Sequence, residues 1–365
     1  MNEHSVEFLK RLLDAPGPSG YEQAPSRVWR AEAETLADEV THDVVGNSYA
    51  RLHPKDRAPG AAKVVFAGHI DEIGFVVTHI DERGFLWFAP LGGWDPQVVV
   101  GQRLRIAGVS GDLTGVIGKK AAHLLTEDDR KQPTKLADMW IDIGAADRAD
   151  AERRVEVGDF AVIDSGFVQL TDDLCCARSL DNRVGAFVAL EAARRLASDR
   201  CAADVYAIAT AQEEITFGGA YTASIAVPSA VAIAIDVTHA TDYPGADMKR
   251  DHEVKLGGGP VLTRGATIND GVYFGLRDAA RRIGISVSFQ ATGESSGTDA
   301  DAMIRSGPGT ATGLVSIPNR YMHSPNEIVS LSDLEQAADL IAEFTRAVTA
   351  ASDFRPGAFV PLRGA

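Results

Sequence analysis

Four short runs of small, mostly apolar residues recur along the chain, and polar, chemically active residues follow each of them. The runs occupy residues 63–68, 205–211, 230–235 and 312–317. They are too short for typical helices and too continuous for strands with one wet face. They therefore predict strands buried on both faces, as in a parallel sheet. Amphipathic stretches between them, such as residues 182–197, predict helices, so the pattern indicates an α/β fold.

The pattern of hydrophobic and polar residues changes between about residues 73 and 163, where short strand-like segments alternate with Gly, Asp and Pro clusters. This pattern predicts a small β-barrel or sandwich inserted into the α/β chain. We therefore expect a discontinuous catalytic domain, 1–72 and 164–365, around an inserted domain at 73–163. The expected strands of the insertion are residues 75–80, 85–88, 98–100, 103–106, 113–117 and 159–163.

Aromatic residues in the inserted segment point to self-association. We expect its strands to expose Phe85, Trp87 and Phe88, because so small a region cannot form a large core. Exposed apolar surface of this kind is typical of a contact with another subunit. The sequence therefore predicts a homo-oligomer.

Charge and cysteine usage exclude several classes of function. The formal net charge is −15, and basic residues are not concentrated enough to hold a phosphate backbone, which argues against nucleic acid as a partner. Three cysteines, two of them adjacent, argue against a disulfide framework and for a reducing cytoplasm. The amino terminus lacks the pattern of a signal peptide, and no apolar run approaches membrane-spanning length.

Metal-binding residue types gather where the predicted strands end. The carboxyl ends of parallel strands share one edge of the sheet, which is where open α/β sheets bind ligands. Nitrogen and carboxylate oxygen together form a suitable donor set for zinc, cobalt or manganese. The Glu pair at 213–214, taken alone, favours a solvated acidic turn, because such pairs are common. The candidate ligands that favour a metal site are His69, Asp181, Glu214, Asp236 and His323.

These five ligands are enough for two ions. A carboxylate can bridge two metals about 3.5–4 Å apart, and Asp181 is the natural bridge because it lies between the other ligands in sequence, at the start of a helix. His69 and Asp236 would complete one site, and Glu214 and His323 would complete the other. A water held between two divalent ions loses its proton near neutral pH and becomes a nucleophile.

Two further carboxylates have predicted roles beside the ions. Neighbouring residues on an extended segment point in opposite directions, so Glu213 could reach the water while Glu214 faces a metal. Glu213 would then accept the proton and deliver it to the leaving amine. Asp71 could accept the second ring N–H of His69 and fix its tautomer.

Two other residues have weaker indications. His123 could contact substrate from the inserted domain, and a purely structural role fits it as well. Asp299 follows Gly297 and Thr298 and is predicted to cap a helix.

Taken together, these motifs resemble the tetrahedral aminopeptidases, the glutamyl/leucyl aminopeptidase-like metallopeptidase family forty-two. The resemblance covers almost the whole chain and rests on several motifs at once. They are Pro16-Gly17-Pro18-Ser19-Gly20-Tyr21-Glu22, His69-Ile70-Asp71-Glu72-Ile73-Gly74, Gly92-Gly93-Trp94, Ser179-Leu180-Asp181-Asn182-Arg183, Gln212-Glu213-Glu214, Asp236-Val237-Thr238 and Arg320-Tyr321-Met322-His323-Ser324-Pro325.

The resemblance implies a zinc-peptidase-like catalytic domain with a mixed sheet and an inserted small β-barrel domain used for dimerisation. It also implies two zinc or cobalt ions per subunit and short peptides as substrates. Dimers that assemble into a hollow tetrahedral dodecamer and a cis peptide bond between Asp181 and Asn182 are further implications. The family's ligand positions match the five ligands above, and its catalytic carboxylate matches Glu213.

Two positions depart from the family pattern. Gly218 stands where the family usually has Arg, and Lys120-Ala121-Ala122-His123 replaces its usual Lys-Pro-Pro-His. Neither touches a ligand position, and the family's substrate preference and assembly therefore do not carry over to this chain from the motifs alone. Two alternatives to an aminopeptidase stay open: a metal-dependent deacylase or amidohydrolase acting on acylated amino acids, and a catalytically silent peptide-binding assembly protein.

Overall fold

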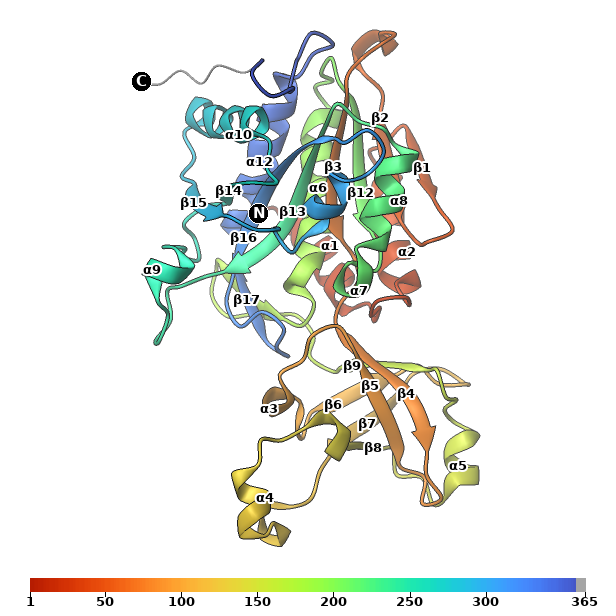
Figure 1. The fold of residues 1–365 in the computed structure, drawn as a ribbon. Coiled ribbons are helices and arrows are strands. Elements are labelled where there is room, and N and C mark those ends of the chain that lie inside the picture. Colours follow the sequence, from red (N-terminus) through yellow and green to blue (C-terminus); the bar gives the residue numbers. More distant parts are fainter. Residues whose placement is uncertain (359–365) are drawn as a thin grey trace.

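An eight-stranded mixed sheet forms the centre of the larger part of the molecule in the computed structural model, which describes residues 1–358 (Figure 1). Four neighbouring strands in its middle run parallel, and the outer pairings include antiparallel ones. In spatial order the strands are β1 (Glu39–His42), β2 (Ser48–Leu52), β12 (Asp204–Thr210), β3 (Lys63–His69), β13 (Val231–His239), β16 (Ala311–Asn319), β14 (Val261–Gly265) and β15 (Ser288–Thr292).

Helices cover both faces of this sheet. One face carries the largest apolar core, which the sheet forms with α1 (Glu3–Asp14), α2 (Gln23–Ala33), α6 (Leu180–Ala197), α10 (Asp270–Ile283) and α12 (Leu331–Arg346). The other face packs against α8 (Gly218–Ala226) and α11 (Asp299–Met303). The central strands are buried from both sides, which explains their continuous apolar sequences.

A close helix–sheet contact lies near the carboxyl end of β3. A Cβ atom added at Gly68 of β3 would come within 2.2 Å of the backbone of Gly185 in α6. Only glycine permits this approach, which brings the start of α6 directly against the end of β3.

A closed six-stranded barrel stands below the sheet and is joined to it by the segments around residues 72 and 164 (Figure 1). Its own core includes Phe75, Phe88 and Ile141. Around the barrel the strands are β4 (Gly74–Ile80), β5 (Leu86–Leu91), β8 (Trp140–Asp142), β7 (Leu113–Gly118), β6 (Arg103–Ile106) and β9 (Phe160–Ile163). The predicted fold class, a mixed α/β sheet with an inserted barrel, is confirmed, and the domain boundaries stay a prediction.

Smaller elements complete the described chain. A three-stranded sheet consists of β10 (Val168–Gln169), β11 (Leu174–Ala177) and β17 (Glu327–Ser330). The short helices are α3 (Pro96–Val99), α4 (Glu127–Lys131), α5 (Arg148–Glu152), α7 (Glu213–Thr216), α9 (Met248–Asp251), η1 (Lys55–Arg57), η2 (Ala122–Leu124) and η3 (Leu136–Asp138). No helix within residues 1–358 is both long and apolar enough to cross a membrane.

Two expectations about the barrel are wrong. Residues 98–100, expected as a strand, instead form the end of the short helix α3 and its C-cap. Pro96 starts this helix, and the Asp95 side chain caps it by accepting from the Gln97 N–H. Phe88 is buried in the barrel core against Phe75, rather than exposed.

The other two aromatic residues expected on the surface, Phe85 and Trp87, are half-buried. Phe85 packs edge-on against Trp140, at a ring-centroid distance of 6.1 Å. The barrel therefore uses its aromatic residues largely for its own packing, which was not expected for so small a unit.

Candidate metal centre

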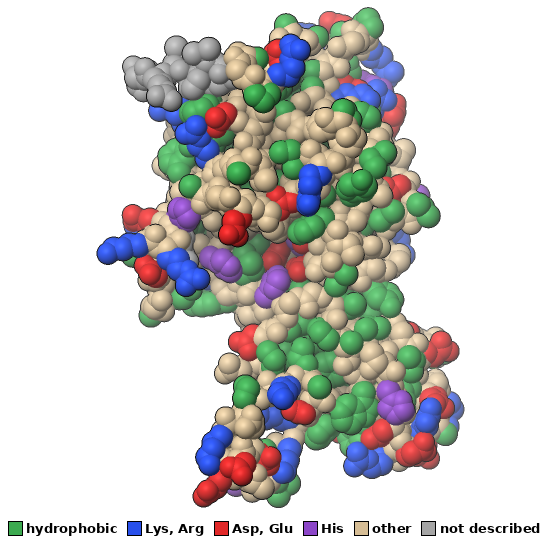
Figure 2. Space-filling model, viewed as in Figure 1, with side chains coloured by type: hydrophobic (Ala, Val, Ile, Leu, Met, Phe, Trp, Pro, Cys, Tyr) green, Lys and Arg blue, Asp and Glu red, His purple; other side chains and the backbone are tan. Residues whose placement is uncertain are grey.

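Five elements bring the candidate ligands to one edge of the sheet. His69 ends β3, Asp236 lies in β13, and Asp181 lies in the first turn of α6. Glu214 lies in α7, directly after β12, and His323 lies in the loop that follows β16. All five line one cavity of about 450 Å³. Figure 2 shows acidic and histidine side chains gathered around a hollow above the barrel.

Asp181 lies between the two histidines. Its Oδ1 is 3.3 Å from His69 Nε2, and its Oδ2 is 3.3 Å from His323 Nε2. Each oxygen of one carboxylate therefore faces a different ring nitrogen, as a bridge between two ions requires. The peptide bond from Asp181 to Asn182 is cis, as the resemblance implied.

The remaining carboxylates divide between the two histidines. Asp236, His69 and Asp181 form one possible metal-binding group. Glu214, Asp181 and His323 form another. Glu214 Oε2 is 3.4 Å from His323 Nε2, whereas Glu213 Oε2 is 3.6 Å from His69 Nε2. Glu213 also forms a possible ligand group with His69 and Glu214, which the sequence did not indicate.

One buried atom at this site has no partner within the described chain. Glu214 Oε1 is inaccessible to solvent and accepts no hydrogen bond there. A buried carboxylate oxygen without a partner is costly unless a cation satisfies it. The donor set of two imidazoles and several carboxylates fits zinc, cobalt or manganese, so the residues present fit a pair of divalent ions.

The electrostatics of the cluster also favour the binding of a cation. Burial, followed by the charges of neighbouring carboxylates, raises the pKa of Glu213 and of Asp236 well above the usual range. Burial alone would lower the pKa of His69, but the charges of Glu213 and Asp71 raise it well above its ordinary value. The cluster thus concentrates more negative charge than its own histidines can balance.

Asp71 contacts both His69 and the glutamate pair. Its backbone carbonyl oxygen lies 3.2 Å and its Oδ1 3.3 Å from His69 Nδ1, and both contacts fit the predicted orienting role. Its two oxygens also accept from the backbone N–H of Glu213 at 3.1 Å and of Glu214 at 3.2 Å. Ser19 donates its hydroxyl to the same carboxylate.

The glutamates themselves are not extended as expected. Gln212 adopts a left-handed conformation, with φ of 59°, and Glu213 and Glu214 begin α7. The N–H groups of both glutamates therefore point towards Asp71. The sequence-based prediction assumed an extended segment with alternating side chains, and that conformation does not produce this arrangement.

Glu327 is a buried carboxylate that the sequence did not single out. Its Oε2 accepts from the Asp181 N–H at 2.7 Å, and its Oε1 accepts from the His323 N–H at 3.0 Å. Burial and then the charge of Asp181 raise the pKa of Glu327, whereas these two N–H groups favour the charged form. One side chain therefore fixes the backbone of two candidate ligands that are far apart in sequence.

A buried ionic network lies behind His69. Glu72 pairs with Arg183 at 2.8 Å and with Arg178 at 3.1 Å, and all three side chains are buried. Arg183 also donates to the Ile70 carbonyl at 3.0 Å and to carbonyls at the end of α1. The motif residues around Asp181 and His69 are thus joined through Arg183 and Glu72.

Asp299 is not the helix cap predicted for it. Thr298 caps α11 by accepting from the Ala300 N–H, and Asp299 is buried and accepts from the Thr210 hydroxyl. Burial raises the pKa of Asp299 to about 6. Thr and Asp both suit helix starts, so sequence alone could not choose between the neighbours.

The barrel approaches the centre through the Gly92-Gly93 turn. A Cβ at Gly92, where φ is +80°, would lie 3.3 Å from Glu214 Oε2, and one at Gly93 would lie 3.3 Å from His323 Nδ1. His123, by contrast, is exposed in the barrel helix η2 and is absent from the residues lining the cavity described above.

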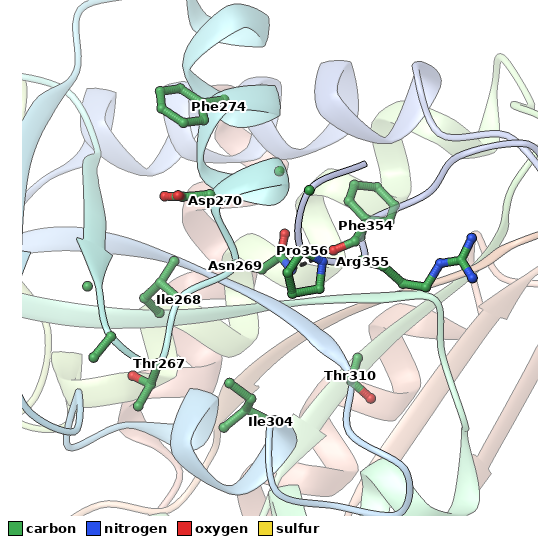
Figure 3. A pocket seen from close by; sticks show the side chains of 14 residues that line it. Thr267, Ile268, Asn269, Asp270, Phe274, Ile304, Thr310, Phe354, Arg355 and Pro356 are labelled. Carbon is green, nitrogen blue, oxygen red and sulfur yellow. Dashed lines mark hydrogen bonds between the residues drawn. The ribbon is translucent and has the colours of Figure 1, made fainter. Parts of the chain in front are cut away.

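A second cavity of similar volume lies at the amino end of α10 (Figure 3). Asn269 donates to the Phe354 carbonyl across it at 2.8 Å. Thr310, just before β16, lines it, whereas His323 lies in the loop that follows the other end of that strand. The described residues that line it include no histidine or cysteine, whereas all five candidate ligands line the first cavity.

Comparison with known proteins identifies the family of this chain. The family model for M42 glutamyl aminopeptidases matches residues 46–340. The chain belongs to the M42 family. Its members are peptidases, and the chain is accordingly a hydrolase of the aminopeptidase class.

Individual relatives cover nearly the full chain. It is 35% identical over 340 residues to the lysyl aminopeptidase of Pyrococcus furiosus, covering 92% of this chain and 94% of that protein. A TET aminopeptidase from a marine sediment thaumarchaeon has a TM-score of 0.89 at 32% identity, covering 95% and 97%. The Pyrococcus horikoshii TET1 peptidase, which can assemble into a tetrahedron or a large octahedral shell, has a TM-score of 0.82 at 31% identity, covering 94% and 100%.

Proposed function

We propose that this M42 protein is a dinuclear metal-dependent aminopeptidase that removes N-terminal residues from short peptides. The observation that carries the proposal is the position of Asp181, with one carboxylate oxygen facing each of the two histidines at 3.3 Å. His69 and Asp236 would hold one ion with it, and Glu214 and His323 the other. Zinc and cobalt are the leading metals, and manganese also fits the donor set.

Two bound divalent ions would polarise the scissile carbonyl and lower the pKa of the attacking water. Glu213 takes the proton of that water and then delivers it to the leaving amine. Asp71 keeps this carboxylate in place by accepting its backbone N–H, and it also orients the His69 ring. Glu327 holds the backbone of Asp181 and His323, so the centre keeps its shape while substrate exchanges.

The protein is further proposed to work as a homo-oligomer, with a dimer as the building block and a tetrahedral dodecamer as the larger assembly. Relatives with the same fold form such shells. Three free cysteines support a reducing cytoplasmic location. Light scattering on the intact protein should show a dimer or larger, and a monomer at micromolar concentration would contradict the assembly.

The two neighbouring glutamates provide the test of the mechanism. Glu214→Gln removes a charged donor, so metal content and activity should fall together, and excess metal should restore part of the activity. Glu213→Gln should retain both ions but lose turnover by about 10²–10⁴-fold, without recovery on adding metal. Chelation of the parent protein should abolish activity, and re-addition of zinc or cobalt should restore it.

Metal analysis and kinetics on both variants, side by side, decide between the roles. If Glu213→Gln loses metal while Glu214→Gln keeps it, the assignments are reversed. If both variants keep full activity, the carboxylate pair is a solvated turn and the mechanism is wrong. Hydrolysis of N-acylated but not free-amine substrates would favour the deacylase alternative.

A further inference from the structure

The cavity that holds the candidate ligands extends beyond them, and its outer part has a distinct composition. Among the described residues that line it, those outside the ligand and base candidates include no lysine, arginine, aspartate or glutamate. Phe217 and Met322 contribute apolar surface, and Thr238, Gln290 and Thr298 contribute neutral polar groups. His239 is the one titratable group among them, and it is exposed at the end of β13.

Gln290 is the residue of this outer part that is best placed to discriminate between charged and uncharged side chains of a bound peptide. Its Oε1 accepts from the Thr238 hydroxyl at 3.0 Å, which links β15 to β13. This hydrogen bond fixes the orientation of the amide and leaves the Nε2 group, a neutral donor, on the other side of the side chain. A glutamate at this position would keep the bond, because a carboxylate also accepts from a hydroxyl.

The adjoining wall is held in place from behind. The buried carboxylate of Asp301 accepts from the backbone N–H of Ser296 at 3.0 Å and of Gly297 at 2.8 Å. The hydroxyl groups of Ser296 and Thr298 lie 2.9 Å apart. The negative charge of Asp301 is thus satisfied by hydrogen bonds from the loop. The groups that this wall presents to the cavity are neutral.

We propose that this part of the cavity receives the N-terminal side chain of the peptide, that it selects an uncharged side chain, and that Gln290 is the position that sets this preference. The inference rests on the proposed aminopeptidase function. A lysyl or glutamyl side chain placed against this wall would lose water without gaining an opposite charge, which is costly. Leucyl and methionyl side chains lose no such hydration and gain contact with Phe217 and Met322.

The first experiment measures kcat/KM of the metal-loaded parent protein on leucyl, methionyl, lysyl and glutamyl p-nitroanilides. We expect the two neutral substrates to be favoured by at least about tenfold, a modest cost for an unpaired charge in a partly buried site. A tenfold preference for the lysyl or glutamyl substrate would overturn the inference but leave the aminopeptidase function intact. Failure to hydrolyse any of the four would overturn the proposed function itself.

The second experiment changes the charge of the wall. Gln290→Glu should raise the ratio of lysyl to leucyl kcat/KM by at least about tenfold, and added salt should reduce the gain. Gln290→Met, which removes the polar group without adding charge, should change that ratio by less than about threefold. Gln97→Glu places the same charge on the exposed surface of the barrel and should leave the ratio unchanged. A lysyl-to-leucyl ratio that Gln290→Glu leaves within twofold of the parent value would refute the assignment of Gln290.

Discussion

Replacement of Glu327 by Gln should weaken metal binding although Glu327 is itself no candidate ligand. The carboxylate accepts two backbone N–H groups, from Asp181 at 2.7 Å and from His323 at 3.0 Å. A glutamine has one oxygen, so one of these donors would face an NH₂ group instead. Losing one hydrogen bond to a charged acceptor costs about 1.5–3 kcal/mol. If that cost falls on the ordered ligand arrangement, metal affinity should drop by about 10- to 150-fold.

The assay is competition for zinc or cobalt against a chromophoric chelator, followed by kcat and KM at saturating metal. Activity should recover largely at high metal, because Glu213 and the ligands remain. Glu191→Gln is the matched control: Glu191 is also buried, lies in the same helix α6, and pairs with Arg194 and Arg195 away from the centre. Equal metal affinities for the Glu327→Gln, Glu191→Gln and parent proteins would refute the argument that Glu327 holds the ligand backbone.

Two further predictions concern the protein away from the reacting groups. Arg183→Met should lower the free energy of unfolding by about 3–5 kcal/mol, because it strips the buried Glu72 of one partner and leaves several buried carbonyls without a donor; a loss below about 1 kcal/mol in denaturant titration would contradict this. Burial raises the pKa of Cys175 to about 12, so at pH 8 the native protein should protect it from iodoacetamide until it is denatured. Mass spectrometry of the peptide that carries Cys175 and Cys176 checks this, and equal labelling of the two thiols in the native state would be the contrary result.

The sequence was most informative where burial and chemistry produce the same pattern. A strand buried on both faces needs a continuous apolar run, so β3, β12 and β13 could be located from their apolar runs alone. Because parallel strands end at a common edge, the sequence alone is enough to group the polar residues that follow them. Asp181 and His323 then followed from that grouping and from the resemblance to the M42 family.

What escaped prediction depends on contacts between segments that are distant in sequence. Glu327 stands in an ordinary strand pattern, and only the fold shows that both of its oxygens serve ligand backbones. The helical start at Glu213 depends on the left-handed Gln212, a conformation that glutamine rarely signals in sequence. Phe88 belongs to the barrel core because the barrel closes, and closure cannot be read from separate short strands.

The point at which the barrel leaves the sheet has a mechanical consequence. His69 ends β3, and β4 of the barrel begins only five residues later, at Gly74. A displacement of the barrel would therefore act on the short segment next to a candidate ligand. Glu72 lies within this connection, and its two buried arginine partners anchor it to α6 and to the segment before it. The ionic network thus fixes the connection itself, so that the position of the His69 end of β3 depends on these buried ion pairs and not on the barrel alone.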